Sequence, residues 1–165
     1  MDKTFGEVRF EKLPRTRIAK HAIFSASPEG DVVSYMEDWA KKSGLFDIEG
    51  YTPRKFGWDV SVDEETKKAN PELRGYGYCM TLPEDFTPKH GGVEITYIEA
   101  DEYAVFRIVD PFSDPFAKIP GGWQELWNFV QNSEYKTRSW EGRYAFEEVT
   151  ESGGVVHMDI YLPIN

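Results

Sequence analysis

Apolar residues recur at helical spacing in two parts of the chain. In WQELWNFV (123–130) they stand at positions i, i+3, i+4 and i+7, and a second stripe follows SPEGD (27–31) and ends before Gly44. Each pattern predicts a helix with one face toward a core. The two tryptophans of the later stripe leave open whether that face only fills a core or also walls a pocket. The stripes consist of Val32, Tyr35, Met36, Trp39 and Ala40, and of Trp123, Leu126, Trp127 and Val130.

Shorter apolar runs, separated by turn-forming residues, predict strands. The hairpin turn ESGG (151–154) separates the last two of these runs. Two connecting segments, DEETKKANPEL (63–73) and DPFSDPFAKIPGG (110–122), are rich in charge, proline or glycine, and we expect both to be loops. The predicted strands cover residues 8–13, 17–24, 54–62, 75–82, 93–100, 102–109, 142–150 and 155–162.

The order strand, strand, helix, strand, strand occurs twice along the chain. Similar residues recur between the two halves at a nearly constant offset, which indicates an internal duplication. We therefore predict a single α+β domain, residues 1–165, with pseudo-repeats at about 6–83 and 92–164. A duplicated ββαββ unit gives a mainly antiparallel sheet, two main helices and a central ligand cleft. The matched positions are Leu13 and Ile98, Ile18 and Tyr103, Ala19 and Ala104, Ile23 and Ile108, Trp39 and Trp127, and Trp58 and Glu147.

Charge and hydropathy narrow the classes of partner. The chain has 19 Lys and Arg against 29 Asp and Glu, a formal charge of −10, whereas nucleic-acid binding depends on cationic side chains that neutralise phosphates. Residues 1–7 precede the first predicted strand and are too few for a helix-turn-helix, so we expect no direct reading of DNA. No apolar run reaches the length of a membrane span, and the N-terminus lacks the apolar core of a signal peptide. We expect a cytoplasmic protein without membrane contact.

Reactive side chains are few and scattered. The histidines His21, His90 and His157 have no neighbours at metal-ligand spacing. Cys79 is the single cysteine, which excludes an intramolecular disulfide, and no base lies near it in the sequence. We therefore expect neither a metal nor a cofactor.

Six stretches of the chain, taken in their joint order, resemble the GyrI-like (gyrase-inhibitor-like) family. This family includes the effector-binding domain at the C-terminus of many bacterial transcription activators, and it also has stand-alone members. The resemblance covers roughly residues 6–164, and none of its motifs is a catalytic signature. The stretches are FGWDV (56–60), YGYCMTLP (76–83), EYAVFRI (102–108), PGGWQELWNFVQNSEY (120–135), AFEEV (145–149) and DIYLPI (159–164).

The resemblance implies two ββαββ repeats around a central hydrophobic pocket that binds lipophilic or amphipathic compounds, often cations. It also implies a pocket glutamate in the penultimate strand, and the family pattern of an apolar residue followed by Glu places this role on Glu147. Glu148 is the next residue and would point to the opposite face of the sheet. A desolvated carboxylate favours a cationic ligand as its partner.

Aromatic residues make up 15% of the chain, and rings serve both as core and as ligand walls. The repeat pairing of Trp58 with Glu147 predicts that both face the same cleft. Phe112 and Phe116 either tuck under the later helix or form a lid over the pocket mouth. The ligand-binding residues that we predict are Glu147, Trp58, Tyr78, Trp123, Trp127, Tyr103, Phe106, Phe112 and Phe116.

Three functions are compatible with the sequence. The first is a protein that senses or sequesters hydrophobic, cationic or planar aromatic molecules. The second is a hydrolase of strained, cyclopropane-type electrophilic toxins, an activity of some stand-alone members of the family, with Glu147 as general base and Tyr78 or Tyr103 as hydrogen-bond donor to the leaving carbonyl. The third is a protein-interaction module such as a gyrase modulator.

Overall fold

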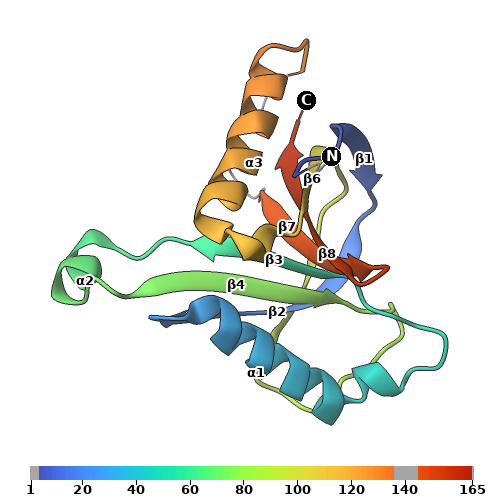
Figure 1. Cartoon of the computed structure of the whole chain (residues 1–165). Helices are drawn as coiled ribbons and strands as arrows, with labels where there is room; N and C mark the ends of the chain where they lie inside the picture. Colours follow the sequence, from blue (N-terminus) through green and yellow to red (C-terminus); the bar gives the residue numbers. More distant parts are fainter. Residues whose placement is uncertain (1–3, 136–144, 165) are drawn as a thin grey trace. The chain divides into compact units, whose positions relative to one another are not determined.

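The computed structural model describes residues 4–135 and 145–164, which belong to two compact units (Figure 1). One unit, called the continuous unit below, is Arg15–Glu99, and the other, the discontinuous unit, joins Met1–Pro14 to Ala100–Asn165. Each unit has an antiparallel sheet with one long helix packed on it. The predictions of an α+β fold, of mainly antiparallel strands and of two main helices are therefore confirmed.

The continuous unit comprises β2 (Thr16–Ser25), α1 (Pro28–Ser43), the 3-10 helix η1 (Leu45–Asp47), β3 (Lys55–Val60), α2 (Glu64–Ala69), β4 (Arg74–Thr81) and β5 (Glu94–Ile98). Its strand order is β3-β4-β2-β5, and α1 packs against β2 and β4. Alternate sheet residues such as Ala19 and Met80 face α1, where they join Met36 and Trp39 in a core. Trp39 is 2% exposed, and its indole N–H donates to the carbonyl of His90 at 3.0 Å.

The described part of the discontinuous unit comprises β1 (Arg9–Leu13), β6 (Asp101–Val109), the 3-10 helix η2 (Pro111–Ser113), α3 (Pro115–Gln131), β7 (Phe146–Ser152) and β8 (Val155–Pro163). Its strand order is β1-β6-β8-β7, and α3 packs on β6 and β8 (Figure 1). Leu126 and Val130 of α3 are fully buried against Ile108 and Ile160. Residues 142–144 of the predicted strand 142–150 lie outside the described residues.

The edge strands are exchanged with respect to the sequence repeats. β1 lies in the first half of the sequence but pairs with β6 of the second half, and β5 of the second half pairs with β2 of the first. The compact units therefore do not coincide with the pseudo-repeats. Both sheets nevertheless have the same order: an edge strand, the strand before the long helix, the last strand and the strand after the helix. The duplication itself stays a prediction.

Two segments that we expected to be loops contain helix. The first half of 63–73 forms α2, because Asp63 caps it by accepting from the backbone N–H of Thr66 at 2.8 Å. The second half of 110–122 is the start of α3, where Pro115 is tolerated because a helix's first turn needs no N–H donor. Pro120 lies inside α3, so its presence did not mark a helix boundary. Among the described helices, none has both the length and the apolar character for crossing a membrane.

Candidate functional site

The sheet of the discontinuous unit has two chemically different faces. Along β8, Met158, Ile160 and Leu162 face α3 and belong to the core, whereas Asp159 and Tyr161 point to the opposite face. Strand alternation and cross-strand pairing place acidic, basic and aromatic residues of all the unit's strands on that opposite face. This face is the candidate site.

Three rings form an aromatic triad on this face: Tyr103 of β6, Phe146 of β7 and Tyr161 of β8. Their centroids are 5.0 to 5.8 Å apart, and the Tyr103 and Tyr161 rings meet edge to face. These are the distances at which aromatic pairs attract one another. All three residues are at most 2% exposed, so packing holds the rings in place.

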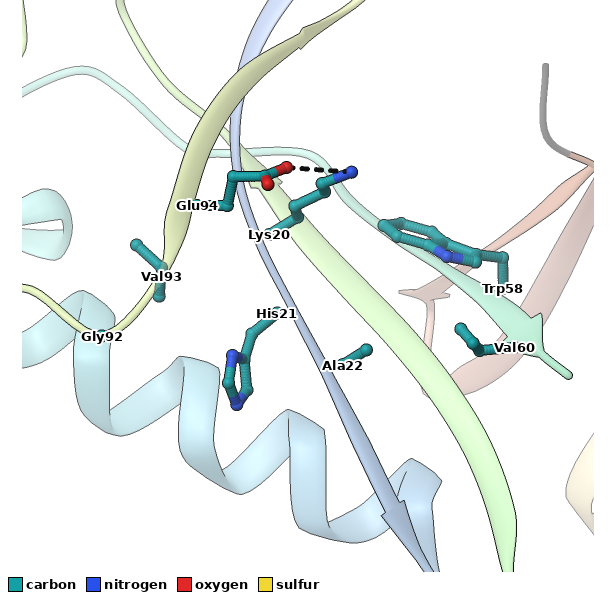
Figure 2. Close-up of a pocket in the computed structure, with 8 residues that line it drawn as sticks. All are labelled: Lys20, His21, Ala22, Trp58, Val60, Gly92, Val93 and Glu94. Carbon is teal, nitrogen blue, oxygen red and sulfur yellow. Dashed lines mark ion pairs between the residues drawn. The ribbon is translucent and has the colours of Figure 1, made fainter. Parts of the chain in front are cut away.

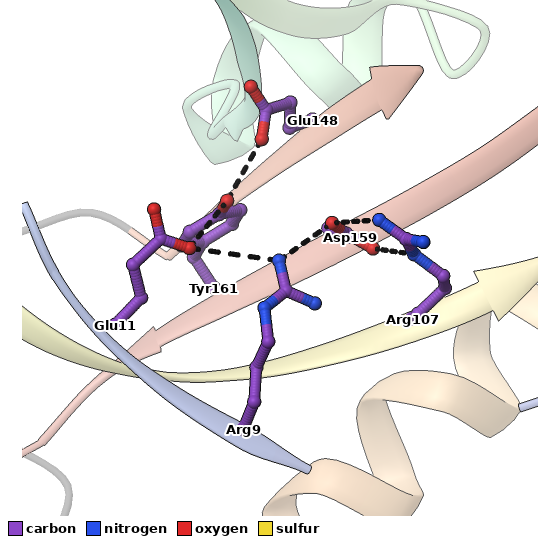
Figure 3. Close-up of polar contacts among 6 residues, drawn as sticks. All are labelled: Arg9, Glu11, Arg107, Glu148, Asp159 and Tyr161. Carbon is purple, nitrogen blue, oxygen red and sulfur yellow. Dashed lines mark hydrogen bonds and ion pairs between the residues drawn. The ribbon is translucent and has the colours of Figure 1, made fainter. Parts of the chain in front are cut away.

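Two carboxylates converge on one hydroxyl of the triad (Figure 3). The Tyr161 hydroxyl lies 2.9 Å from Oε1 of Glu148 on β7 and 3.3 Å from Oε2 of Glu11 on β1. A tyrosine hydroxyl donates a single hydrogen, so it bonds strongly to one carboxylate at a time. Glu148 is 8% exposed, so its carboxylate lies beside the Tyr161 hydroxyl and largely away from water. We call Glu11, Glu148 and Tyr161 the carboxylate–tyrosine cluster.

A third carboxylate is held by two arginines beside this cluster (Figure 3). Asp159 accepts from Arg9 Nη2 at 2.8 Å and from Arg107 Nε and Nη2 at 2.8 and 3.1 Å. Burial alone would raise the pKa of Asp159, but the hydrogen bonds from Arg107 and Arg9 outweigh it and hold the pKa below its usual range. Arg9 Nη2 also lies 3.7 Å from Glu11 Oε2. These three carboxylates and two guanidiniums give the group a formal charge of −1.

Glu147 and Glu148 lie on opposite faces of the sheet. Glu148 is paired with Asp159 and lies on the aromatic face, whereas Glu147 is paired with Ile160 and lies on the α3 face, half-buried. Trp58, the expected repeat mate of Glu147, is paired with Gly77 and points away from the helix of its own unit. Within its own unit Trp58 therefore lies on the face away from the helix and Glu147 on the face toward it, whereas the repeat pairing places them on equivalent faces. An alignment error of one residue is enough to exchange the faces of a strand.

The other predicted ligand residues of the discontinuous unit are dispersed. Tyr103 belongs to the aromatic triad, but Phe106 lies in the α3 core, with its ring stacked on Phe5 at 5.4 Å, and Trp123 packs half-buried against the same core. Three further residues are largely exposed: Trp127 at 41%, Phe112 at 56% and Phe116 at 91%. Phe112 and Phe116 are therefore not tucked under α3.

In the continuous unit, two predicted ligand residues lie on opposite faces of the sheet. Tyr78 faces α1 and packs against its core, where burial, followed by the charge of Glu37, raises the pKa of its hydroxyl. Trp58 faces the other way and lines a groove of about 520 Å³ (Figure 2). The lining residues of this groove, called the Trp58 groove below, are Lys20, His21, Ala22, Trp58, Val60, Gly92, Val93 and Glu94.

The Trp58 ring rests on a glycine. A Cβ placed on Gly77 would lie 2.5 Å from two atoms of the indole, so the ring fits only because Gly77 has no side chain. Gly75 makes the same room for Phe24, whose ring a Cβ would meet at 2.7 Å. The GYGY sequence (75–78) thus provides a flat floor for two rings on the face away from α1.

Sequence reasoning missed several residues of the aromatic face. Phe146, Asp159 and Tyr161 lay within stretches that carried the family resemblance, and strand alternation alone would have placed Asp159 and Tyr161 together. Glu11 had no local signal, because its place depends on the pairing of β1 with β6. The described residues contain no group of three or more His, Cys, Asp or Glu arranged to hold a metal ion.

No family model and no curated protein matches the sequence. Solved structures do match over nearly the whole chain. The C-terminal domain of EcmrR is 12% identical with a TM-score of 0.68, and the match covers 96% of this chain and 97% of that one. In the EcmrR–DNA complex, the match covers 98% of this chain but 58% of that one, at 11% identity and a TM-score of 0.66. The chain thus spans little more than half the length of EcmrR in that complex.

Two further matches were solved in other functional contexts. SAV2435 bound to tetraphenylphosphonium is 11% identical with a TM-score of 0.54, and the match covers 97% of this chain and 94% of that one. A hydrolase from Listeria innocua is 11% identical with a TM-score of 0.57, and the match covers 96% and 92%. At such low identity these likenesses concern the fold. The chain has the GyrI-like fold that its sequence resembles.

Proposed function

We propose that this protein binds a lipophilic organic cation on the aromatic face of the discontinuous unit, with Glu148 as the anionic anchor. The observation that carries the proposal is the convergence of two carboxylates on the Tyr161 hydroxyl beside the aromatic triad. The proposal keeps the ligand class expected from the sequence and assigns the anchoring charge to the neighbour of Glu147.

The chemistry of the face favours a large cation with delocalised charge. A carboxylate in an environment of reduced dielectric attracts a unit charge about 4 Å away by about 4 kcal/mol. A small, strongly hydrated cation would lose its water at high cost, whereas an organic cation with apolar arms has little hydration to lose.

The negative formal charge of the face favours a positively charged ligand. Asp159 is neutralised by Arg9 and Arg107, and the residues of the group retain a charge of −1. The whole chain has a charge of −10, which also attracts cations from solution. Among the proteins of similar fold, SAV2435 binds tetraphenylphosphonium, a cation of this kind.

The test is a calorimetric titration with tetraphenylphosphonium and with neutral triphenylphosphine oxide, which has similar phenyl groups. We expect the cation to bind at least about tenfold more tightly, a difference of about 1.4 kcal/mol. Raising the salt concentration should weaken binding of the cation more than binding of the neutral compound. Equal affinities for the two compounds, or binding of neither, would overturn the proposal.

A hydrolase is the second candidate, because the Tyr161 hydroxyl donates to Glu148 at 2.9 Å. A carboxylate in this position has the chemistry of a general base: it would take a proton from water as the water oxygen bonds to a strained cyclopropane carbon. The breaking C–C bond would deliver its electron pair to a conjugated carbonyl, which becomes a phenolate. Ring opening of such a compound, followed by absorbance with and without the protein, distinguishes turnover from binding. A rate that exceeds the uncatalysed rate and falls in Glu148→Gln would establish hydrolysis.

A further inference from the structure

The strand before the long helix, β6 in one unit and β2 in the other, is covered to a different extent along its outer edge in the two units. In the discontinuous unit, residues 4–6, which precede β1 in the sequence, also lie alongside β6. The N–H of Gly6 donates to the carbonyl of Arg107 at 2.9 Å, and the N–H of Val109 donates to the carbonyl of Thr4 at 2.7 Å. Phe5 forms an antiparallel bridge with Ile108. The last third of β6 is thus covered by an extended segment.

The corresponding strand of the continuous unit is β2, which occupies the same place in the strand order. Its edge partner β5 pairs with it from Thr16 to Lys20, where Lys20 is opposite Glu94. Before Glu94 the chain turns away at Gly92, which has a φ of +91° and whose carbonyl accepts from the Tyr35 hydroxyl at 2.6 Å. Among the described residues, no strand pairs with β2 on this side from His21 to Ser25.

The direction of the backbone groups on this edge follows from the ladder on the other side. Leu82 N–H donates to the carbonyl of Arg17, so the odd-numbered residues of β2 direct their amides toward β4. Ala22 and Phe24 therefore direct their N–H and C=O groups outward, away from β4, on the side where β5 pairs only as far as Lys20. With the offset of 85 residues, they correspond to Arg107 and Val109, the two residues that bond to the covering segment.

We propose that the edge of β2 from His21 to Ser25 binds an extended peptide of a partner protein as an additional antiparallel strand. The Ala22 carbonyl and the Phe24 N–H would bond to its backbone, as Arg107 and Val109 bond to residues 4–6. Alternate side chains of the peptide would enter the Trp58 groove, which begins at this edge (Figure 2).

The groove and its surroundings specify the chemistry of the peptide. Trp58, Ala22 and Val60 offer an apolar surface, while Lys20 and Glu94 form an ion pair with N···O of 3.0 Å at one end (Figure 2). An apolar side chain therefore fits between them. At the other end of the edge, Ser25 bonds to the carboxylate of Asp31 at 2.6 Å. Arg74, opposite Ser25, is paired with Glu29 at 2.7 Å, so Asp31 leaves this end with a formal charge of −1. In the antiparallel direction this acidic end meets the N-terminal part of the peptide, which favours a basic residue there.

The test uses the full chain and the peptide Ac-KVTFTV-NH2, with amide hydrogen exchange and calorimetry as the readouts. We expect saturable binding and slower exchange of the Phe24 amide in the complex. Two control peptides carry N-methyl groups at odd or at even positions, so that one of them blocks the amides that face β2. We expect that control to lose at least about tenfold in affinity while the other retains it.

Variants of the edge complete the test. In Ala22→Pro a ring carbon stands at the edge in place of the outward N–H and blocks the approach of a strand, without loss of a bond to β4, whereas Ala22→Ser leaves the edge open. We expect the proline variant alone to lose peptide binding while both variants keep the thermal stability of the wild type. Should the proline variant unfold, the methylated peptides decide the question on the wild-type protein. Equal binding of both methylated peptides, absence of binding, or self-association through this edge that the peptide does not displace would overturn the proposal.

Discussion

Replacing Asp159 with asparagine removes one charge from the aromatic face and leaves the side chain's shape unchanged. Asp159 is 2% exposed and bonds to Arg9 and Arg107 through three hydrogen bonds of 2.8 to 3.1 Å. The variant would leave two guanidiniums without their shared carboxylate. We therefore expect lower stability of the discontinuous unit, measured as the free energy of unfolding in urea.

The magnitude follows from the exposure of the partners. Loss of one member of a buried ion pair typically costs about 3–5 kcal/mol. Here the side chains of Arg9 and Arg107 are 42% and 40% exposed, so water screens them in the variant. We expect a loss of about 2–3 kcal/mol for Asp159→Asn at pH 7. Glu99→Gln is the matched control, because its ion pair with Arg15 is exposed and contributes less than about 1 kcal/mol.

The pH dependence has a defined sign. The pKa of Asp159 is lowered in the folded state, so its contribution is complete above the ordinary value of 3.8 and is lost as the pH falls through the depressed pKa. The difference between wild type and Asp159→Asn should be constant at neutral pH and shrink in acid. Equal stabilities at pH 7, or a difference that grows in acid, would refute this account of the arginine pair.

Four further predictions concern other parts of the chain. Partial desolvation and then the charge of Glu29 raise the pKa of Asp59, so Asp59→Asn should slightly stabilise the fold at pH 7, and urea titrations should show the gain disappearing in acid. Gly77→Ala forces a Cβ against the Trp58 ring and should cost about 1–3 kcal/mol and shift the tryptophan emission. Gly30→Ala on α1 meets nothing within 4 Å and should instead gain up to about 1 kcal/mol. Phe116→Ser should change the free energy of unfolding by less than about 0.5 kcal/mol, since Phe116 is 91% exposed.

The tryptophan stripe of α3 illustrates what periodicity resolves. The 3.6-residue pattern located the helix, and Leu126 and Val130 are buried as that pattern predicts. Trp127 lies on the same sequence stripe but at its edge, and it is 41% exposed. A broad apolar stripe on one helix cannot be assigned to core or surface until the width of the opposing sheet is known.

The pair Glu147 and Glu148 illustrates where sequence reasoning stops. Both residues lie on a strand, so one must face α3 and the other the opposite side. The repeat alignment and the family pattern selected Glu147, whereas the register opposite Ile160 and Asp159 decides the faces. That register depends on the pairing of β7 with β8, which a single sequence does not contain.

The aromatic face depends on still longer contacts. Glu11 reaches the Tyr161 hydroxyl from 150 residues away in the sequence. This contact requires the exchanged pairing of β1 with β6, whereas the sequence repeats suggest that β1 belongs with its own half. The ligand class that we propose, by contrast, rests on composition and resemblance, because both concern the types of residues present and not their pairing.

Paired isosteric variants test the central assignment most directly. Tetraphenylphosphonium would be titrated into the wild type, Glu148→Gln and Glu147→Gln, with folding of each variant checked by its melting temperature. If Glu148 is the anionic anchor, Glu148→Gln weakens binding at least about tenfold, while Glu147→Gln binds as the wild type does. Undiminished binding in Glu148→Gln, or a loss confined to Glu147→Gln, would contradict the assignment of the site to the aromatic face.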